Sequence, residues 1–433
     1  MRILVHDFSG HPFQAELSRA LAAKGHTVEH LHAEQYVSGK GHLEALEDDA
    51  PGLSFFGLKL DLPFAKYSPW TRLRFERAYG KAWIERQRTR EDDVVIASNV
   101  PLVSLFRFAR WARRAQQPWV MWHQDVYSVG LADELRRRFP RPLAAIGAKV
   151  LDAMEAYCAR GAAHVVAIGD GFTDTYRRWS VPEEDVSVIP NWAPLDKVFP
   201  VERENPRSTD LFPAKDALRL LYAGTLGRKH NPMLLVDILQ ATRNRGVPAS
   251  LTVVSEGEGA DDLREAAAAN PDLDLRVLPF QPAGDLPDVL GSADVLVALL
   301  EPDATAFSIP SKVLSYMAAG RPILGLMPED NPAALDVLAT GGHVGPPTCD
   351  GAEGAIEWLE KLHAAPESVE VIGSRARSVA EEKFDLELIA GQFTSILARS
   401  HGTVVPEPPA LPVEEQPAPE RRPLGSPVPR RVE

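Results

Sequence analysis

The chain has 433 residues, of which 45% are hydrophobic and 25% charged, so it has the length of two globular domains and the composition of an ordinary globular protein. Its two cysteines, Cys158 and Cys349, are too few for a disulfide framework or a thiolate metal site, and no uncharged apolar run approaches the roughly 18 residues that span a membrane. The net charge of −13 argues against nucleic acid as a partner of the molecule as a whole.

The first predicted element is a short apolar strand, RILVHDF, and not a basic stretch followed by an apolar one, so we expect a cytoplasmic protein without a secretory leader. A loop with Gly10 follows, and then a helix in which Phe13, Leu17 and Leu21 recur every four residues. A second strand is predicted at TVEHLHA, and the same order of strand, small loop and amphipathic helix returns at DDVVIASN, PWVMWHQD, HVVAIGDG and VSVIPN. This alternation predicts an α/β domain with a parallel, doubly wound sheet over residues 1–195.

The charge balance reverses within residues 61–160, which contain 18 lysines and arginines against 11 aspartates and glutamates. Residues 70–90 interleave arginines with three aromatic residues on one helical stripe, namely Phe75, Tyr79 and Trp83. Such a helix fits an anionic membrane surface, to which residues 107–141 would add charge, and it predicts peripheral attachment at the inner face of the plasma membrane. The alternative is a helix whose aromatic stripe packs on its own core while its arginines stay solvated.

Residues 196–216 are rich in proline and charge and show neither the apolar periodicity of a helix nor that of a strand. This segment therefore predicts an interdomain linker. A second α/β domain is predicted over residues 217–380, with strands at LRLLYAG, ASLTVVSEGEG, LDLRVLPF, ADVLVALLEP and RPILGLM. Residues 381–400 are amphipathic and predict a closing helix, whereas residues 401–433 contain nine prolines and predict a disordered tail. The sequence therefore predicts two Rossmann-like domains that face a cleft.

The strand LRLLYAG leads into a loop, TLGRKHNP, that carries two cations just before a helix begins near Pro232. Gly224 lets the backbone approach a ligand closely, Arg228 and Lys229 supply positive charge, and the first turn of the helix offers free N–H groups. This combination suits a diphosphate. The alternative is a solvated loop with two surface cations.

A second cationic loop opens the segment FSIPSKVLSYMAAGRPILGLM, residues 307–327. Ser308 and Ser311 are expected to cap the helix, and Lys312 places a full positive charge at the helix end where a cation is disfavoured. A bound anion would resolve this conflict, and the alternative is a lysine that extends into solvent. Because open α/β sheets bind ligands at the carboxyl ends of their strands, two such loops in one sheet favour a phosphate site.

A glycine-rich dinucleotide fingerprint does not follow the first strand, where HDFSGHPFQ stands, and SEGEG after Val254 carries acidic side chains. The sequence therefore argues against a dinucleotide-dependent dehydrogenase. Because no Asp-x-Asp pair lies at the end of a predicted strand, neither a metal nor another cofactor is expected.

Taken together, the motifs of the second half resemble the donor-binding half of the retaining GT-B glycosyltransferases of family 4. These motifs are YAGTLGRKHNP, LTVVSEGEGADDLREAA, RVLPF, SADVLVALL and IPSKVLSYMAAGRPIL. The segment VVAIGDGFTDTYRRWSVPEEDVSVIPNWAP is similar to the end of their N-terminal domain. Within the family, the PSK, AAGRP and NWA variants resemble the branch that assembles colanic acid, other exopolysaccharides or O antigen, and the likeness extends over roughly residues 1–400.

The resemblance implies which residues bind the donor. Arg228, Lys229 and Lys312 would hold the diphosphate, and Glu256 and Phe280 would lie near the nucleotide. The full implied donor site consists of Gly10, Gly224, Thr225, Arg228, Lys229, Glu256, Phe280, Ser308, Ser311, Lys312 and Ser315.

The motif WHQDVY occupies the place of the family's catalytic histidine or aspartate, which leaves His123 and Asp125 as alternatives. The sequence departs from the family's pattern at the pair of carboxylates that the family usually places toward the transferred sugar and the ribose. These positions fall on Phe307 and Ser315, so both carboxylates are absent and Ser315 offers the ribose a single hydrogen bond.

The expected function is a metal-independent, retaining transfer of a sugar from a nucleotide-diphosphate donor to a glycan or polyprenyl-diphosphate-linked acceptor in cell-surface polysaccharide assembly. Two alternatives stay open at this point. A sugar-nucleotide epimerase shares the architecture and the phosphate cradle, but it needs acid/base carboxylates in the cleft. A catalytically silent nucleotide-sugar-binding partner of another transferase would account for Phe307 and Ser315. The sequence leaves the base, the sugar, the acceptor and the oligomeric state open.

Overall fold

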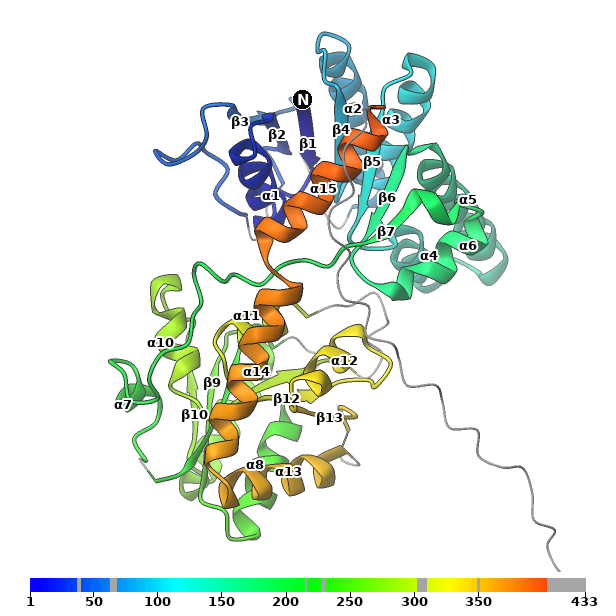
Figure 1. Cartoon of the computed structure of the whole chain (residues 1–433). Coiled ribbons are helices and arrows are strands. Elements are labelled where there is room, and N and C mark those ends of the chain that lie inside the picture. The colour runs from blue at the N-terminus through cyan, green and yellow to red at the C-terminus, as the bar shows by residue number, and fades with distance from the viewer. Residues whose placement is uncertain are drawn as a thin grey trace, which may run out of the picture.

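The computed structural model describes residues 1–36, 40–62, 68–214, 216–226, 231–301, 310–348 and 351–402. Two α/β domains lie one above the other in Figure 1, joined by an extended linker and by a pair of helices near the end of the described chain. The predicted disordered tail is residues 401–433, of which residues 403–433 lie outside the described ranges. Within these ranges, no helix combines the length and the apolar character that crossing a membrane requires.

The first domain is built on a seven-stranded parallel sheet with the order β3-β2-β1-β4-β5-β6-β7. All residues of its central strands β4 and β5 are buried, because helices cover both faces of a parallel sheet. The strands are β1 (Arg2–Asp7), β2 (Thr27–Ala33), β3 (Leu53–Leu58), β4 (Val94–Ser98), β5 (Trp119–His123), β6 (His164–Ala167) and β7 (Val186–Val188). The helices are α1 (Pro12–Ala23), α2 (Pro69–Gln87), α3 (Leu102–Ala115), α4 (Tyr127–Arg138), α5 (Arg141–Gly161) and α6 (Thr173–Trp179).

The aromatic stripe of α2 faces the protein interior. Phe75 is 1% exposed, and Tyr79 and Trp83 are fully buried. The Trp83 ring stacks on the ring of Phe108 from α3, with centroids 3.8 Å apart. The prediction that this stripe meets a lipid surface is therefore wrong: a core-facing helix and a membrane-facing helix share one periodicity, and here the stripe belongs to the core. Trp70, at the start of α2, remains 79% exposed.

The second domain contains a six-stranded parallel sheet with the order β10-β9-β8-β11-β12-β13. Each face of this sheet has its own hydrophobic cluster, one formed with α10, α11 and α12 and the other with α8, α9 and α13. The strands are β8 (Leu218–Ala223), β9 (Ala249–Val254), β10 (Leu275–Leu278), β11 (Val295–Leu299), β12 (Ile323–Leu326) and β13 (His343–Gly345). The helices are α8 (Met233–Asn244), α9 (Glu258–Ala269), α10 (Leu286–Gly291), α11 (Ser311–Ala318), α12 (Pro332–Ala339) and α13 (Ala352–Ala364).

The linker between the domains contains one short helix, α7 (Ser208–Leu211), and lies against the second domain. Arg203 fixes it there, because its guanidinium donates to both carboxylate oxygens of Asp294, at 2.7 and 3.0 Å, and to the carbonyl oxygen of Ala217. The fully buried Arg219 forms an ion pair with Glu204 of the linker at 2.7 Å. The linker is thus a fixed part of the second domain's surface.

The predicted closing helix is divided into two helices, α14 (Glu367–Lys383) on the second domain and α15 (Leu386–Ser400) on the first. Asp385 starts α15 by accepting a hydrogen bond from the backbone N–H of Leu388 at 2.9 Å. The buried side chain of Phe393 meets the Trp122 ring edge-on at 5.0 Å. Helix α15 therefore crosses back to the first domain, and the expected GT-B architecture of two Rossmann-like domains is confirmed.

Candidate active site

The carboxyl ends of the strands form one edge of each parallel sheet, and these two edges approach each other. Asp170 follows β6 in the first domain, and Asp336 lies on α12, which follows β12 in the second. Burial raises the pKa of Asp336 to about 6, with Lys383 opposing the rise and the negative charge of Asp170 adding to it. The charge of Asp170 therefore acts on Asp336 across the domain boundary.

The predicted donor site includes Gly224, directly after β8, and Lys312, in the first turn of α11, and the structure brings these two residues together. The Lys312 Nζ donates a hydrogen bond to the hydroxyl oxygen of Tyr222 at 2.5 Å and lies 4.1 Å from the centre of its ring. A Cβ atom added to Gly224 would lie 3.2 Å from Nζ, and the φ of this glycine is +142°. Lys312 therefore folds back over β8, and the absence of a side chain at Gly224 makes room for its ammonium group.

The environment of Lys312 disfavours its charge. Burial lowers the pKa of its ammonium group to about 8, and none of the described carboxylates forms an ion pair with it. The positive end of α11 acts in the same direction. The alternative of a lysine extended into solvent is therefore wrong, whereas the expectation that Lys312 binds an anion stays a prediction.

The predicted capping of α11 by serine side chains is only partly testable in the structure. Pro310 is the residue that precedes the helix, and no side chain caps it. Ser311 is instead the first residue of the helix, so its predicted capping role is wrong, because proline occupies the cap position. Ser315 is half-buried on the same helix. The predicted cap at Ser308 and the missing-carboxylate position Phe307 lie outside the described residues.

The neighbouring strands contribute Glu256 after β9 and Phe280 after β10. The backbone N–H of Phe280 donates to Oε1 of Glu256 at 3.4 Å, and the Phe280 ring is 48% exposed. Gly257, in the same turn, has a φ of +102°, which L side chains rarely adopt. Glu256 and Phe280 thus place an exposed carboxylate and an exposed aromatic ring after β9 and β10, and their contact with a nucleotide stays a prediction.

Thr225 contributes its backbone, since its carbonyl oxygen accepts a hydrogen bond from the Tyr222 hydroxyl at 3.0 Å. This bond fixes the Tyr222 hydroxyl, whose oxygen in turn accepts from Lys312. Arg228 and Lys229 lie outside the described residues, so the predicted pairing of Lys229 with Lys312 around one diphosphate stays a prediction.

In the first domain, the predicted acceptor domain, Asp7 lies at the end of β1 and is fully buried beneath the Gly10 loop. One carboxylate oxygen accepts from the backbone N–H of Ser9 and from the Asn99 side chain, and the other accepts from the backbone N–H of His11 at 2.5 Å. Burial outweighs these bonds and raises the pKa of Asp7 to about 7. Gly10 has a φ of +73°, so Asp7 holds a loop that needs glycine at its tip. Sequence reasoning did not single out Asp7, although an aspartate between an apolar strand and a glycine loop is a detectable signal.

The alternatives His123 and Asp125 have different environments. His123 is 2% exposed, and its ring nitrogens contact the hydroxyl of Tyr176 at 2.9 Å and the carboxylate of Glu155 at 3.1 Å. Asp125, two residues after the same strand, is exposed. Desolvation raises the pKa of Asp125, His123 opposes this rise, and the negative charge of Glu155 adds to it. The geometry therefore gives His123 two internal partners, whereas Asp125 is exposed and yet partly desolvated.

Glu155 of α5 is the residue of this network that sequence reasoning missed. It is fully buried, and it accepts hydrogen bonds from the backbone N–H groups of Tyr127 at 2.9 Å and Ser128 at 2.7 Å as well as contacting His123. Burial alone would raise the pKa of Glu155, but the hydrogen bonds from His123 and Ser128 outweigh it and hold this pKa below its ordinary value. Glu155 thus fixes the start of α4 and the orientation of His123.

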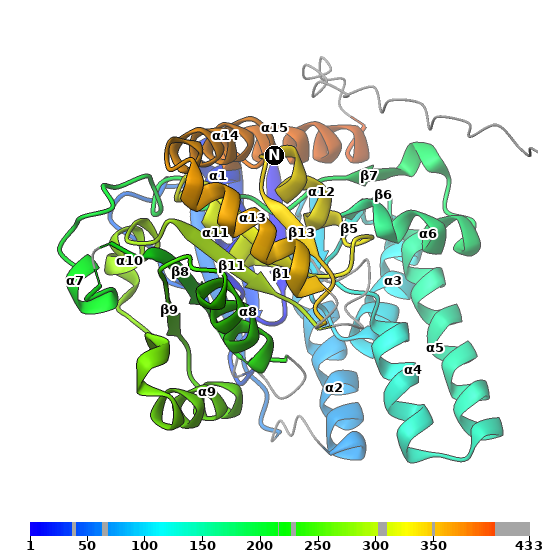
Figure 2. The same ribbon diagram turned by 90° about the horizontal axis from the view of Figure 1, so that it is seen from below.

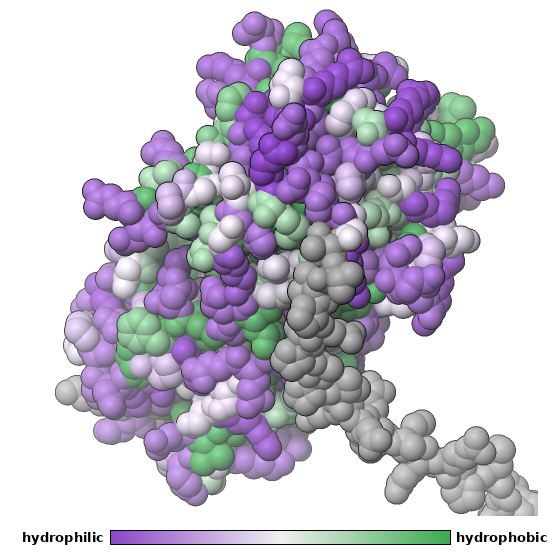
Figure 3. Space-filling view, turned by 45° about the horizontal axis from the view of Figure 1, so that its top comes forward, coloured by the Kyte–Doolittle hydropathy of each residue, from purple (hydrophilic) through white to green (hydrophobic). Residues whose placement is uncertain are grey.

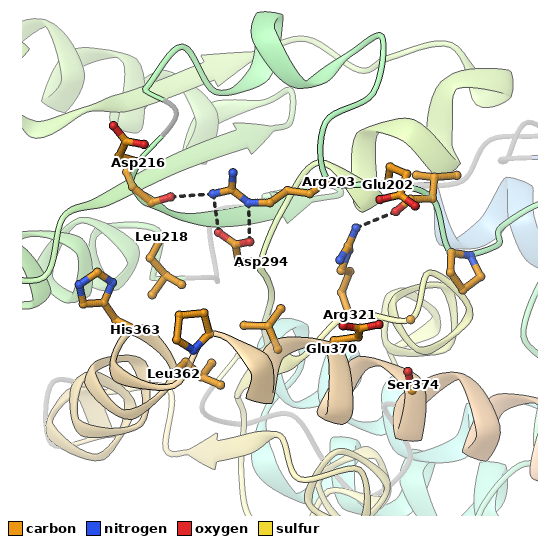
Figure 4. Close-up of a pocket in the computed structure, with 16 residues that line it drawn as sticks. Glu202, Arg203, Asp216, Leu218, Asp294, Arg321, Leu362, His363, Glu370 and Ser374 are labelled. Atoms are coloured by element: carbon orange, nitrogen blue, oxygen red, sulfur yellow. Dashed lines mark hydrogen bonds and ion pairs between the residues drawn. The ribbon is translucent and has the colours of Figure 1, made fainter.

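A separate cavity of about 840 Å³ lies at the opposite edge of the second sheet (Figure 4). Its walls include Leu218, the first residue of β8, and Asp294 and Arg321, which precede β11 and β12. Arg203 is paired with Asp294 there, and Arg321 donates to the carbonyl oxygens of Val201 and Gly291 at 2.7 and 2.6 Å. These cations already hold the linker, and the cavity lies away from the carboxyl edge where the predicted donor residues Gly224 and Lys312 lie.

Comparison with known proteins agrees with this architecture. Residues 11–192 match the glycosyl transferase 4-like domain family, and residues 217–380 match the family described as glycosyl transferases group 1. The probable glycosyltransferase WbjE of Pseudomonas aeruginosa is 24% identical over 256 residues, which cover 59% of this chain and 62% of that protein. The chain therefore spans about three fifths of the length of this curated relative.

Two solved structures show how far the likeness in fold extends. The sucrose-phosphate synthase of Thermosynechococcus elongatus superposes with a TM-score of 0.66 at 16% identity, over 92% of this chain and 98% of that chain. Anabaena HepE in complex with UDP-glucose superposes with a TM-score of 0.63 at 16% identity, over 92% of this chain and all of that chain, 100%. At these identities the likeness concerns the fold alone.

Proposed function

Because residues 11–192 belong to the glycosyl transferase 4-like family and residues 217–380 to the glycosyl transferases group 1 family, we propose that the chain is a GT-B glycosyltransferase that uses a nucleotide-diphosphate sugar as donor. The observation that carries the proposal is the position of Lys312, a half-buried cation without a carboxylate partner among the described residues, against Gly224 at the carboxyl edge of the second sheet. A diphosphate supplies the anion that this position lacks. The complex of Anabaena HepE with UDP-glucose supports a donor of this class.

The proposed reaction needs charge stabilisation more than covalent chemistry. When the bond between the anomeric carbon and the donor's β-phosphate oxygen breaks, negative charge develops on the departing diphosphate. Lys312 and the free N–H groups at the start of α11 stabilise that charge without a metal ion, assisted by Arg228 and Lys229 of the loop after β8. In a retaining transfer, the acceptor hydroxyl attacks from the face that the diphosphate leaves, and its proton passes to the leaving oxygen.

On the acceptor side, we propose that the Asp125 carboxylate acts at the anomeric carbon of the transferred sugar. Its carboxylate is exposed at the end of β5, whereas His123 is held by Tyr176 and Glu155. A carboxylate there stabilises positive charge at the anomeric carbon and orients the sugar. His123 acts through this network as a positioning residue. The proposed acceptor is a glycan or polyprenyl-diphosphate-linked sugar in cell-surface polysaccharide assembly, as the PSK and AAGRP variants indicate.

The test is a donor panel. Melting temperatures measured with UDP-, GDP- and dTDP-sugars should rise for the matching donor, because a ligand at 100 times its Kd stabilises the native state by about 2.7 kcal/mol. Lys312→Ala should abolish the rise, whereas Lys361→Ala, which removes an exposed lysine of α13, should not. A panel that gives neither a melting shift nor acceptor-dependent release of nucleoside diphosphate would refute the proposal. The family matches do not favour the epimerase alternative, and binding without turnover over a panel of acceptors would support a silent partner.

A further inference from the structure

Four apolar side chains at the junction of α4 and α5 are exposed to solvent. Phe139 is 48% exposed, and along α5 Leu143, Ile146 and Val150 are 61%, 62% and 54% exposed. The spacing of the last three places them on one face of the helix, and α5 is buried in the first domain at Ala144 and, toward its C-terminal end, from Glu155 to Ala159. We call these four residues the α4–α5 apolar stripe. A monomeric protein rarely leaves such a contiguous apolar patch open without a partner.

The α4–α5 apolar stripe is surrounded by positive charge. Residues 136–150 contain five cations and no carboxylate, in a chain whose net charge is −13. Two of the cations are paired within α4, Arg136 with Asp133 and Arg138 with Glu134, each at 2.5 Å. The other three are exposed and have no ion-pair partner among the described residues: Arg137, Arg141 and Lys149.

Figure 2 shows that the loop joining α4 and α5 projects at the margin of the first domain, away from the second domain's helices. In Figure 3, hydrophobic side chains gather at the upper right of the molecule, on the side where Figures 1 and 2 place α4 and α5. Purple, hydrophilic side chains surround them. The stripe is thus a projecting apolar surface with a charged rim, and none of the described elements covers it.

We propose that the α4–α5 apolar stripe docks this protein on an anionic lipid surface. The apolar side chains would enter the interface between headgroups and acyl chains, while Arg137, Arg141 and Lys149 would contact anionic headgroups. The acidic remainder of the chain is repelled by the same surface, which orients the molecule with this corner toward the lipid. A second copy of the chain fits less well, because it would bring together two clusters that each contain three unpaired cations.

The proposal goes beyond the transfer reaction, since vesicle binding needs no donor and no turnover. It also has a geometric consequence for that reaction. Helix α4 begins at Tyr127, two residues after Asp125, and its 12 residues span about 18 Å. Docking at the far end of α4 would therefore hold the acceptor side of the cleft roughly 20 Å from the lipid surface.

The experiment measures co-sedimentation of the full chain with vesicles of phosphatidylglycerol and phosphatidylethanolamine, against vesicles of phosphatidylcholine alone. The wild-type chain should bind the anionic vesicles and lose affinity as salt rises. Replacing three apolar residues, Leu143→Ser with Ile146→Ser and Val150→Ser, should weaken binding at least about tenfold. Replacing three cations, Arg137→Gln with Arg141→Gln and Lys149→Gln, should weaken it by about fivefold for each charge.

The matched control replaces apolar residues of similar exposure in the second domain: Leu335→Ser, Leu338→Ser and Val371→Ser, which are 64%, 52% and 67% exposed. This variant should bind vesicles like the wild type. The proposal is overturned if the wild type does not bind anionic vesicles at low salt, or if it binds phosphatidylcholine vesicles equally well. It is also overturned if the control variant loses as much vesicle affinity as the stripe variant. A dimer in sedimentation equilibrium that the stripe variant abolishes would assign the surface to a second copy instead. Melting curves with and without donor show whether each variant is folded and keep this test separate from the proposed transfer.

Discussion

The substitution Gly224→Ala tests the donor site through a single added methyl group. The new Cβ would lie 3.2 Å from the Nζ and 3.4 Å from the Cε of Lys312, so the lysine must move off its position over Tyr222. The φ of +142° is also unfavourable for alanine, which costs about 1–3 kcal/mol. For a domain of this size, that cost lowers the melting temperature by about 2–4 °C per kcal/mol.

The larger expected effect is on donor binding. If Lys312 donates a charge-assisted hydrogen bond to the diphosphate, its displacement removes about 1.5–3 kcal/mol of binding free energy. The donor Kd, measured by calorimetry, should then rise about 10- to 150-fold. The matched control is Gly246→Ala, because Gly246 has a φ of +87° and an added Cβ there meets no atom within 4 Å. This control should lose stability but keep donor affinity. An unchanged Kd in Gly224→Ala, or an equal loss in Gly246→Ala, would refute the assignment of Lys312 to the donor.

Three further predictions follow from the described contacts. Asp125→Asn should lower kcat by about 100-fold at unchanged donor Kd, whereas Glu155→Gln should chiefly lower the melting temperature, because the Glu155 carboxylate accepts two backbone N–H bonds. The pKa of Lys312 is about 8 in the folded chain against an ordinary 10.5, so between these pH values the unfolded chain binds more protons and the lysine's contribution to stability rises with pH. Thermal melts from pH 8 to 10 should show this rise in the wild type and a smaller one in Lys312→Met, and donor affinity should fall above pH 8. In denaturant titrations, Trp83→Ala should lower the free energy of unfolding by about 3–5 kcal/mol, since Trp83 is fully buried. Trp70→Ala, at a 79% exposed position, should change it by no more than about 0.5 kcal/mol.

The sequence predicted most strands because their residues are buried on both faces and therefore read as continuous apolar runs. The two strands it missed, β3 (Leu53–Leu58) and β13 (His343–Gly345), are the outermost strands of their sheets and only partly buried. An edge strand with mixed burial has no such run, and a three-residue strand is too short to show a period. The break at Phe384 and Asp385 was also missed, because both helices beside it share one amphipathic pattern.

The candidate site was predictable where the signal is local. Lys312 at a helix start and Gly224 after a strand are both visible in the sequence, and parallel strand order implies a shared edge. The contact of Lys312 with Tyr222 was not predictable, because it depends on β8 and β11 being neighbours. The same limit applies to Glu155, which reaches His123 from 32 residues away. The α2 stripe was ambiguous for a different reason, since helical periodicity does not distinguish a core from a lipid surface.

The properties of Lys312 can be treated as one thermodynamic cycle. Burial shifts its pKa from 10.5 to about 8, so holding the charged form in the free protein costs on the order of 3 kcal/mol. A lysine at the positive end of α11 without a described carboxylate partner keeps that cost until an anion arrives. An anion that restores the ordinary pKa recovers the same free energy on binding, which corresponds to about two orders of magnitude in affinity. The strained position of Lys312 therefore favours ligands in proportion to the negative charge they place beside Gly224, so a nucleoside diphosphate should bind far more tightly than the corresponding nucleoside.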